Sequence, residues 1–408
     1  MTTAPAVRFL DRASPPHILT LVLMAGIAAT SMSIFLPSLP AMAAYFGADY
    51  AVIQLSVSLY LAVTGLLQLV IGPLSDRYGR RPVTLAAMAI FLVATVGCLL
   101  APTVGVFLAF RMLQGAVVVG IVLSRAIVRD MVPEAQAASM IGYVTMGMAL
   151  VPMVVPMVGG ALDELFGWHA VFVFLLLFGA AVTALIWADQ GETAASTGRS
   201  MGQQVRDYPE LLTSPRFWGY AMAAAFASGA FFAFLGGAPY AASEIYGMSP
   251  FWTGVAFGAP AIGYFFGNFL SGRFSARVGI NRMMLWGAGT VTCGMSLSVL
   301  LALSGLSHPA VFFTAMTTVG AGNGMMIPNA TSGMLSVRPH LAGTASGLGG
   351  AIMIGGGAAM SVLAGVVLEG SATSLPLQAL MLGTSVAALS STLYVIARTR
   401  RLAHAGGG

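Results

Sequence analysis

Positions 72–82 of this 408-residue chain read GPLSDRYGRRP, a polar segment between two long apolar runs. Part of this pattern returns 200 residues later: positions 272–279 read GRFSARVG and keep two glycines, a serine and an arginine at the same spacing. A second pair, positions 106–115 and 311–320, each begins with Val-Phe and ends with Gly. Both pairs follow the same order along the chain, so the sequence predicts two similar halves.

The composition excludes a water-soluble globular protein. The chain is 58% hydrophobic and only 8% charged, with a mean hydropathy of +0.88, whereas soluble domains average roughly 25% charged residues. Disorder is excluded by the same values, because it requires low hydrophobicity and high charge. A membrane span takes about 20 apolar residues, so the chain has room for roughly a dozen spans.

Apolar runs broken by charge, proline or glycine predict twelve membrane-spanning helices. They cover residues 17–37, 50–71, 83–101, 105–128, 138–160, 169–188, 215–240, 250–271, 283–304, 309–330, 342–367 and 375–397. The longest polar stretch, Asp189 to Pro215, separates six helices from six. We therefore predict an all-α polytopic membrane protein with an N-terminal six-helix bundle over 1–188, a cytoplasmic linker over 189–214, and a C-terminal bundle with a short tail over 215–408.

The charges predict the orientation. All 18 basic residues are arginines, and when the N-terminus is placed in the cytoplasm, 17 of them lie on that side and none on the other. This distribution follows the positive-inside rule and places both termini in the cytoplasm. The eighteenth, Arg111, lies within the fourth predicted helix. The arginines form no single basic face, which argues against nucleic-acid binding.

Segment 72–82 resembles the signature loop of the major facilitator superfamily, G-x-L-x-D-R-x-G-R-R/K, and parallel repeats are how that fold is built. The resemblance implies a major facilitator fold with two pseudo-symmetric six-helix bundles. It also implies a conformational latch, which consists of Gly72, Asp76, Arg77, Gly79, Arg80 and Arg81. Here the aspartate can accept hydrogen bonds from a neighbouring helix N-terminus and pair with arginine. Ala276 replaces it in the second copy, so we expect that copy to be structural.

Arg111 opens the sequence RMLQG at positions 111–115. A charged side chain inside a span costs about 2.5–3.5 kcal/mol and is by default a functional hypothesis. The sequence resembles the family's R-x-x-Q-G motif, which implies an arginine that faces the central cavity and serves proton or substrate handling. Alternatively, the side chain could extend to the nearby membrane surface.

The fifth predicted helix resembles the family's antiporter motif, G-x8-G-x3-G-P-x2-G-G. The matching residues are Gly142, Pro152, Pro156, Gly159 and Gly160, while valines replace two of the motif's glycines. Because the motif occurs largely in exporters, it implies efflux. Physically, the same residues describe a proline-kinked helix that packs closely.

Four further segments resemble the bicyclomycin/chloramphenicol-resistance (Bcr/CflA) branch of drug:proton antiporters. They are FLPSLP at 35–40, RAIVRD at 125–130, FGWH at 166–169 and IPNA at 327–330. The branch usually carries an aspartate in the first helix, where this chain has Ser33. No acid lies deep in a predicted helix, so proton coupling is implied by the resemblance, with acids at the helix ends such as Asp76, Asp130 or Glu164 as carriers.

The substrate cavity should be apolar and aromatic with few polar groups. Candidate lining residues are Ser33, Phe35, Tyr60, Gln114, Tyr143, Phe231, Phe234, Tyr264, Asn268 and Asn323. A cavity that holds a lone cation should disfavour cationic drugs, so we expect neutral or anionic amphipathic substrates.

The sequence thus predicts a proton-coupled multidrug efflux transporter of the bacterial inner membrane that exports drugs such as phenicol or bicyclomycin-like antibiotics. We expect a monomer in the lipid bilayer that binds small-molecule drugs, with no cofactor, no metal and no nucleic-acid partner. A metabolite facilitator or importer of the sugar or nucleoside type remains an alternative. The two similar halves argue against a receptor or channel. The absence of a convergent His/Asp/Glu cluster argues against an enzyme.

Overall fold

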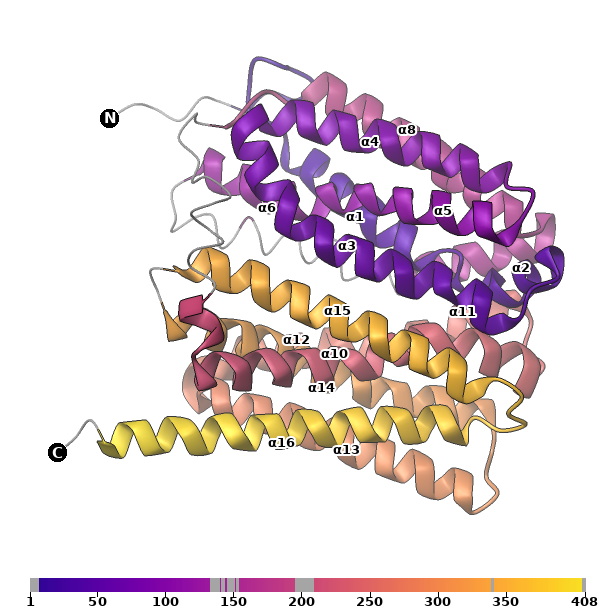
Figure 1. Ribbon diagram of the computed structural model, residues 1–408, viewed down its shortest axis with the longest axis vertical. Coiled ribbons are helices and arrows are strands. Elements are labelled where there is room, and N and C mark those ends of the chain that lie inside the picture. Colours follow the sequence, from indigo (N-terminus) through magenta and orange to yellow (C-terminus); the bar gives the residue numbers. More distant parts are fainter. Residues whose placement is uncertain are drawn as a thin grey trace. The chain divides into compact units, whose positions relative to one another are not determined.

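The computed structural model describes residues 7–132, 140, 144, 151, 154–194, 209–338 and 341–405. Throughout these residues the regular structure is helical. The chain forms two compact units, Met1–Met201 and Gly202–Gly408 (Figure 1). The division between them lies inside the predicted linker.

The first unit begins with three consecutive short helices that together extend the first predicted span. Its elements are α1 (Ile18–Ser33), η1 (Leu36–Ser38), α2 (Leu39–Phe46), α3 (Tyr50–Tyr78), α4 (Arg80–Leu99), α5 (Val104–Gln114), η2 (Gly115–Val118), α6 (Val119–Met131) and α8 (Trp168–Asp189). The prediction ended the first span at residue 37, but Pro37 and Pro40 each lie in the first turn of a new helical segment. Proline is compatible with a first turn, where its missing N–H has no helical partner.

The second unit consists of α10 (Pro215–Tyr240), the π-helical turn η3 (Ala241–Ile245), α11 (Pro250–Ala256), α12 (Gly258–Val278), α13 (Ile280–Leu303), α14 (Pro309–Val337), α15 (Ala342–Leu368) and α16 (Leu375–Ala405). Several of these helices run past the predicted ends: α14, for example, reaches residue 337 instead of 330. Hydropathy locates the apolar centre of a span, whereas the helix continues wherever the backbone hydrogen bonds do.

The repeated glycine pattern corresponds to the same backbone geometry in both units. The segment predicted as a loop is helical up to Tyr78, and the break occurs at Gly79, with φ +96° and ψ 151°. In the second unit, Gly279 ends α12 with φ +90° and ψ 147°. A side chain is strained at such positive φ, so glycine is required at both breaks.

Ten helical stretches in the described part of the chain are long and apolar enough to cross a membrane. The fifth predicted helix lies largely outside the described residues, and the eighth, which is interrupted at Phe257, is not among the ten. Large apolar side chains are exposed on both units, including Val93, Leu177 and Phe269. Such surfaces suit contact with lipid rather than water.

Within the second unit, α12 and α14 approach so closely that their backbones are in contact. A Cβ atom added at Gly263 would overlap the carbonyl oxygen of Thr317, and one added at Gly320 would overlap that of Pro260. Gly267 and Gly324 repeat this relation one turn further along. Small residues four apart are the usual means of close helix packing in membranes.

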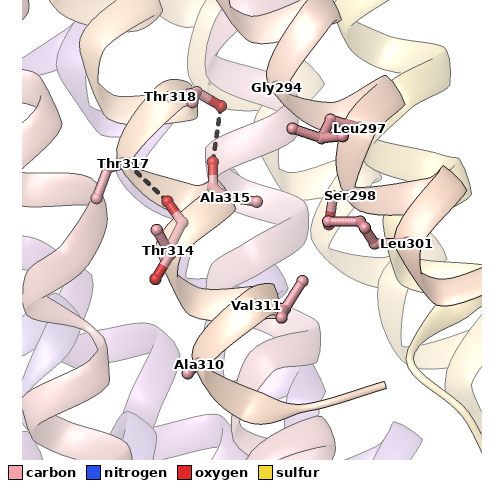
Figure 2. A pocket seen from close by; sticks show the side chains of 10 residues that line it. All are labelled: Gly294, Leu297, Ser298, Leu301, Ala310, Val311, Thr314, Ala315, Thr317 and Thr318. Carbon is pink, nitrogen blue, oxygen red and sulfur yellow. Dashed lines mark hydrogen bonds between the residues drawn. The ribbon is translucent and has the colours of Figure 1, made fainter. Parts of the chain in front are cut away.

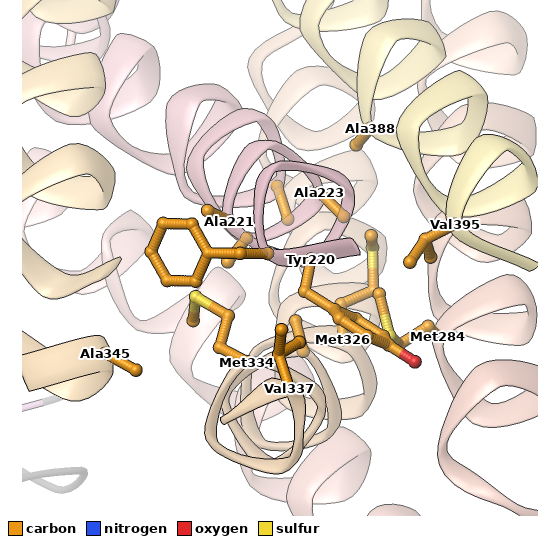
Figure 3. Packing of buried hydrophobic residues seen from close by; sticks show 14 of the residues in the cluster. Tyr220, Ala221, Ala223, Met284, Met326, Met334, Val337, Ala345, Ala388 and Val395 are labelled. Carbon is orange, nitrogen blue, oxygen red and sulfur yellow. The ribbon is translucent and has the colours of Figure 1, made fainter. Parts of the chain in front are cut away.

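The apolar core of the second unit surrounds α10 (Figure 3). The ring of Tyr220 fills the space that a side chain at Gly333 would need, and Met284 and Met326 lie nearby in the same cluster. The Tyr220 hydroxyl donates to Asn281 Oδ1 at 2.9 Å, so the ring is buried while its polar atom is satisfied.

We predict that Gly320→Ala lowers the free energy of unfolding by about 1–3 kcal/mol, because the new methyl group overpacks the α12–α14 contact. Gly289→Ala on α13 is the matched control, since its Cβ meets no atom within 4 Å and alanine favours helix by about 1 kcal/mol. Thermal unfolding in detergent measures both. An equal melting temperature for the two variants would contradict this packing.

Candidate functional site

Arg111 lies inside the first unit, near the end of α5, with none of its surface exposed. The alternative in which its side chain extends to the membrane surface is therefore wrong. α5 changes to the tighter η2 directly after Gln114, where the Cβ position of Gly115 lies 3.2 Å from a Val63 methyl group on α3. This close approach brings α3 and α5 together around the arginine.

The guanidinium group donates its hydrogen bonds to neutral oxygens. Nη1 donates to Gln114 Oε1 at 2.7 Å and to Ser31 Oγ at 3.1 Å, and Nη2 donates to the Ser31 carbonyl oxygen at 2.7 Å. Nε donates to the Ser56 carbonyl oxygen at 3.3 Å. Gln114 is held in turn, because its Nε2 donates to Thr95 Oγ1 at 2.7 Å. Residues from α1, α3, α4 and α5 thus fix the orientation of one side chain.

Two aromatic rings complete the surroundings of Arg111. Its Cζ lies 4.3 Å from the ring centre of Phe35 and 4.0 Å from that of Tyr60. Cation–π contacts of this kind contribute about 2 kcal/mol or more when they are desolvated. None of the ion pairs among the described residues involves Arg111. The site therefore retains a positive charge that neutral groups orient but do not cancel.

Three of the predicted cavity residues, Phe35, Tyr60 and Gln114, thus contact Arg111. Ser33 does not join them: its hydroxyl donates to the Ala29 carbonyl oxygen of its own helix at 3.0 Å. Ser31, two residues earlier and on a different face of α1, makes the contact instead. Ser31, Ser56 and Thr95 are not among the residues predicted from the sequence, although helical spacing from Phe35 (i, i+4) identifies Ser31.

The remaining predicted cavity residues belong to the second unit, apart from Tyr143, which lies outside the described residues. The ring of Phe234 lies 4.8 Å from that of Phe257 and 6.5 Å from that of Phe231, within a buried aromatic cluster. Asn268 donates to the carbonyl oxygen of Tyr264 at 2.8 Å.

Asn323 is buried within α14. Its Oδ1 has no hydrogen-bond partner among the described residues.

A hollow of about 440 Å³ lies between α13 and α14 of the second unit (Figure 2). The hydroxyls of Thr317 and Thr318 in its wall donate to the carbonyl oxygens of Thr314 and Ala315, at 2.6 and 2.7 Å. The exposed side chain of Leu297 stands at its edge. None of the predicted cavity residues lines this hollow, so it is not the predicted site.

The predicted latch residues form a charge cluster at the start of α4. Arg80 pairs with Asp76 and also with Asp130, where Nε and Oδ2 are 2.9 Å apart. The amides that open α4 are bound by Glu192, not by Asp76: its carboxylate accepts from Arg80 N at 2.8 Å and from Arg81 N at 3.2 Å.

Of the other latch residues, Arg77 stacks over Tyr78. Gly79 leaves room for the Glu192 carboxylate, which a Cβ atom there would crowd.

The described part of the antiporter motif packs against the end of α1. A Cβ atom added at Gly159 would overlap the carbonyl oxygen of Ile34, and Pro156 and Gly160 are buried beside it. Gly142 and Pro152 lie outside the described residues. In the described residues, the motif therefore allows the backbone around Gly159 to approach the end of α1 closely.

Comparison with known proteins establishes the family. Residues 21–362 match the model of the Major Facilitator Superfamily. The chain belongs to the major facilitator superfamily. The predicted family and fold class are thereby confirmed, and the chain is a multi-pass membrane protein of a family of transporters rather than enzymes. Major facilitator transporters generally need no cofactor, and the described residues contain no group of three or more His, Cys, Asp or Glu side chains suited to a metal ion.

Among relatives of this superfamily member, YdgK of Bacillus subtilis strain 168, named an uncharacterized MFS-type transporter, is 31% identical and covers 89% of this chain and 91% of its own length. A chloramphenicol resistance protein from Pseudomonas aeruginosa is 32% identical, over 80% of this chain and 79% of its own. Multidrug resistance protein D of Escherichia coli K12 is 29% identical, over 85% of this chain and 88% of its own length.

The solved structure of a D-xylose-proton symporter superposes with a TM-score of 0.75 at 14% identity and covers 93% of this chain and 96% of its own. At this identity, the likeness shows the major facilitator fold and nothing about substrate.

Glu192 gives the cluster a defined pH dependence. Burial raises its pKa, but the hydrogen bonds from the main-chain amides of Ala194, Arg80, Arg81 and Thr193 outweigh burial and hold the pKa below its ordinary value. Its contribution to stability is therefore present above the unfolded-state pKa and is lost as the pH falls through the folded-state pKa. We predict that Glu192→Gln lowers the melting temperature at neutral pH.

The difference between Glu192→Gln and the wild type should disappear in acid, once the carboxylate of the wild type is protonated. Melting curves over a range of pH values measure it. Glu164→Gln, which alters an exposed carboxylate, should show a smaller difference. A destabilisation by Glu192→Gln that is the same at every pH would contradict this assignment.

Proposed function

We propose that this chain is a proton-coupled multidrug efflux transporter that exports small neutral or anionic amphipathic drugs, such as phenicol or bicyclomycin-like antibiotics, by alternating access. Relatives named for chloramphenicol, multidrug and bicyclomycin resistance support export of drugs. The single observation that carries the substrate class is the Arg111 site, where a buried cation has hydrogen bonds only to neutral oxygens.

Electrostatics leads from this site to the substrate class. In a medium of low dielectric constant a fixed charge acts over several ångströms with little screening, so a second cation is repelled. An anion, or a neutral molecule whose carbonyl or nitro oxygens carry partial negative charge, is attracted. Phe35 and Tyr60 add apolar area beside the charge. A charged carboxylate near Arg111 would have cancelled this preference.

The transport cycle that we propose uses the two halves as moving bodies. Residues 1–188 and 215–408 form the two six-helix bundles, and 189–214 link them in the cytoplasm, where both termini lie. The cluster of Asp76, Arg80 and Asp130 acts as the latch that closes in one conformation and opens in the other. The setting is the bacterial inner membrane and the transporter is a monomer.

We predict that Arg111→Ala abolishes protection of cells against a transported drug and abolishes drug-driven proton movement in proteoliposomes. Arg111→Lys keeps the charge but not the planar fork that bonds Ser31 and Gln114 together, so we expect partial activity. The repeat places Met316, also fully buried, at the corresponding position of the second unit. Met316→Ala is therefore the control: it removes buried volume without changing the preference for substrate charge.

A panel of neutral, anionic and cationic drugs tests the substrate class directly in wild-type proteoliposomes. The expected result is drug-dependent proton movement with neutral and anionic members only. Efficient transport of a lipophilic cation by the wild type would overturn the assigned class, and counterflow of a sugar or nucleoside would favour the metabolite transporter.

A further inference from the structure

The acids of this chain differ sharply in how their charge is compensated. Two of the 13, Glu134 and Asp207, lie outside the described residues, which leaves 11. Asp76 and Asp130 pair with Arg80, and Glu210 pairs with Arg338. Most of the others face solvent or are bound by main-chain amides: Asp11, Asp49, Glu164, Glu192, Glu244 and Glu369. Only two of the described acids, Asp163 and Asp189, are buried.

Asp189 is a carboxylate with a complete set of donors. Its Oδ1 accepts from Leu10 N at 2.7 Å, and its Oδ2 accepts from His17 N at 2.8 Å and Thr20 Oγ1 at 2.6 Å. These bonds hold the segment before α1 against the end of α8. The charged form is satisfied in place, so its role is structural.

Asp163 lacks such a complete set of donors. Its side chain is buried, and Oδ2 meets no donor within hydrogen-bonding geometry among the described residues. The buried Ser38 hydroxyl faces this carboxyl group from η1 and favours its charged form. Trp168, five residues further on, has a buried Nε1 without a hydrogen-bond partner among the described residues.

These three polar groups share one end of the first unit. Gly159, one helical turn before Asp163, contacts the Ile34 backbone, and the ring of Trp168 lies 5.7 Å from that of Phe46 on α2. Unpaired buried polar groups are rare and call for an explanation. A buried carboxylate with one facing hydroxyl costs far more than its neutral acid, so burial outweighs Ser38 and this environment favours the protonated form.

We propose that Asp163 is the proton-binding carboxyl group of the transport cycle, in place of the acid that Ser33 replaces in the first helix. The proposal rests on the proposed function, since it assigns the coupling proton of that transporter. One proton from the outside water adds to the carboxylate and leaves it neutral. Its release to the cytoplasmic side, after the outer end has closed and the inner end has opened, regenerates the charge. In the proposed orientation this end of the unit faces the outside, where a proton-motive force supplies protons.

Linkage gives the direction of coupling. Burial raises the pKa of Asp163; the facing Ser38 hydroxyl lowers it and the charge of Glu164 raises it. Since the pKa is raised in the buried state, protonation favours the conformation in which Asp163 is buried, and loss of the proton favours one in which it reaches water. Proton binding from outside therefore drives closure of this end.

The experiment compares wild type with Asp163→Asn, a permanently neutral side chain of the same shape. In proteoliposomes we expect drug-dependent proton movement to be lost, while drug counterflow, which needs no net proton transfer, is kept and no longer depends on pH. Glu369→Gln is the matched control, because it neutralises an exposed acid of the second unit, and it should retain coupling. Persisting proton movement in Asp163→Asn, or loss of counterflow with it, would overturn the proposal.

A second measurement does not require a transported drug. Infrared difference spectra recorded above the ordinary range of carboxyl pKa values, where exposed acids stay ionised, should show the band of a protonated carboxyl group in the wild type and lose it in Asp163→Asn. An unchanged band in the variant overturns the assignment even if transport is impaired. Absence of any drug transport by the wild type would instead refute the proposed function, while the titration would still decide whether Asp163 binds a proton.

Discussion

The burial of one guanidinium group, that of Arg111, is the interaction on which the arrangement of the first unit depends. A cation inside a membrane-spanning bundle is unfavourable unless its donors are satisfied and its charge is spread. Four hydrogen bonds to neutral oxygens and two aromatic faces do both, and they require residues of α1, α3 and α5, together with Phe35, to meet at one point. The same contacts leave the charge uncancelled, which is the basis of the substrate preference that we propose.

The repeat shows how far the two units have diverged. In the first unit α3 ends at Gly79, and in the second unit α12 ends at Gly279. The two glycines have nearly identical dihedral angles. Their polar chemistry does not match, because Met316 occupies the place of Arg111 and Ala276 that of Asp76. Among the described residues, the proposed latch and the buried Arg111 both belong to the first unit, while the interior of the second offers aromatic and small side chains. One half thus carries the buried charge and the other the close apolar packing.

Periodicity and composition predicted the fold well, and side-chain detail less well. The apolar runs, the placement of the arginines and the repeated glycines are enough to predict a duplicated helical membrane protein. In lipid, few structures satisfy all the hydrogen-bonding groups of the backbone. The residues that bind Arg111 were harder to predict. Ser33 and Ser31 are equally polar, and they differ only in the face of α1 on which they lie. Glu192 and Asp163 lie far along the chain from the groups they face, so no local pattern identifies them.

The direct backbone contact between α12 and α14 has a mechanical consequence. Where glycines let two main chains touch, no intervening side chain can change rotamer to absorb sliding. The pair must therefore move as one rigid body, and any bending has to occur at the irregular joints, such as the interruption at Phe257 that precedes α12. In the second unit, the rigid α12–α14 contact and the flexible joint at Phe257 are thus separated by only a few residues of sequence.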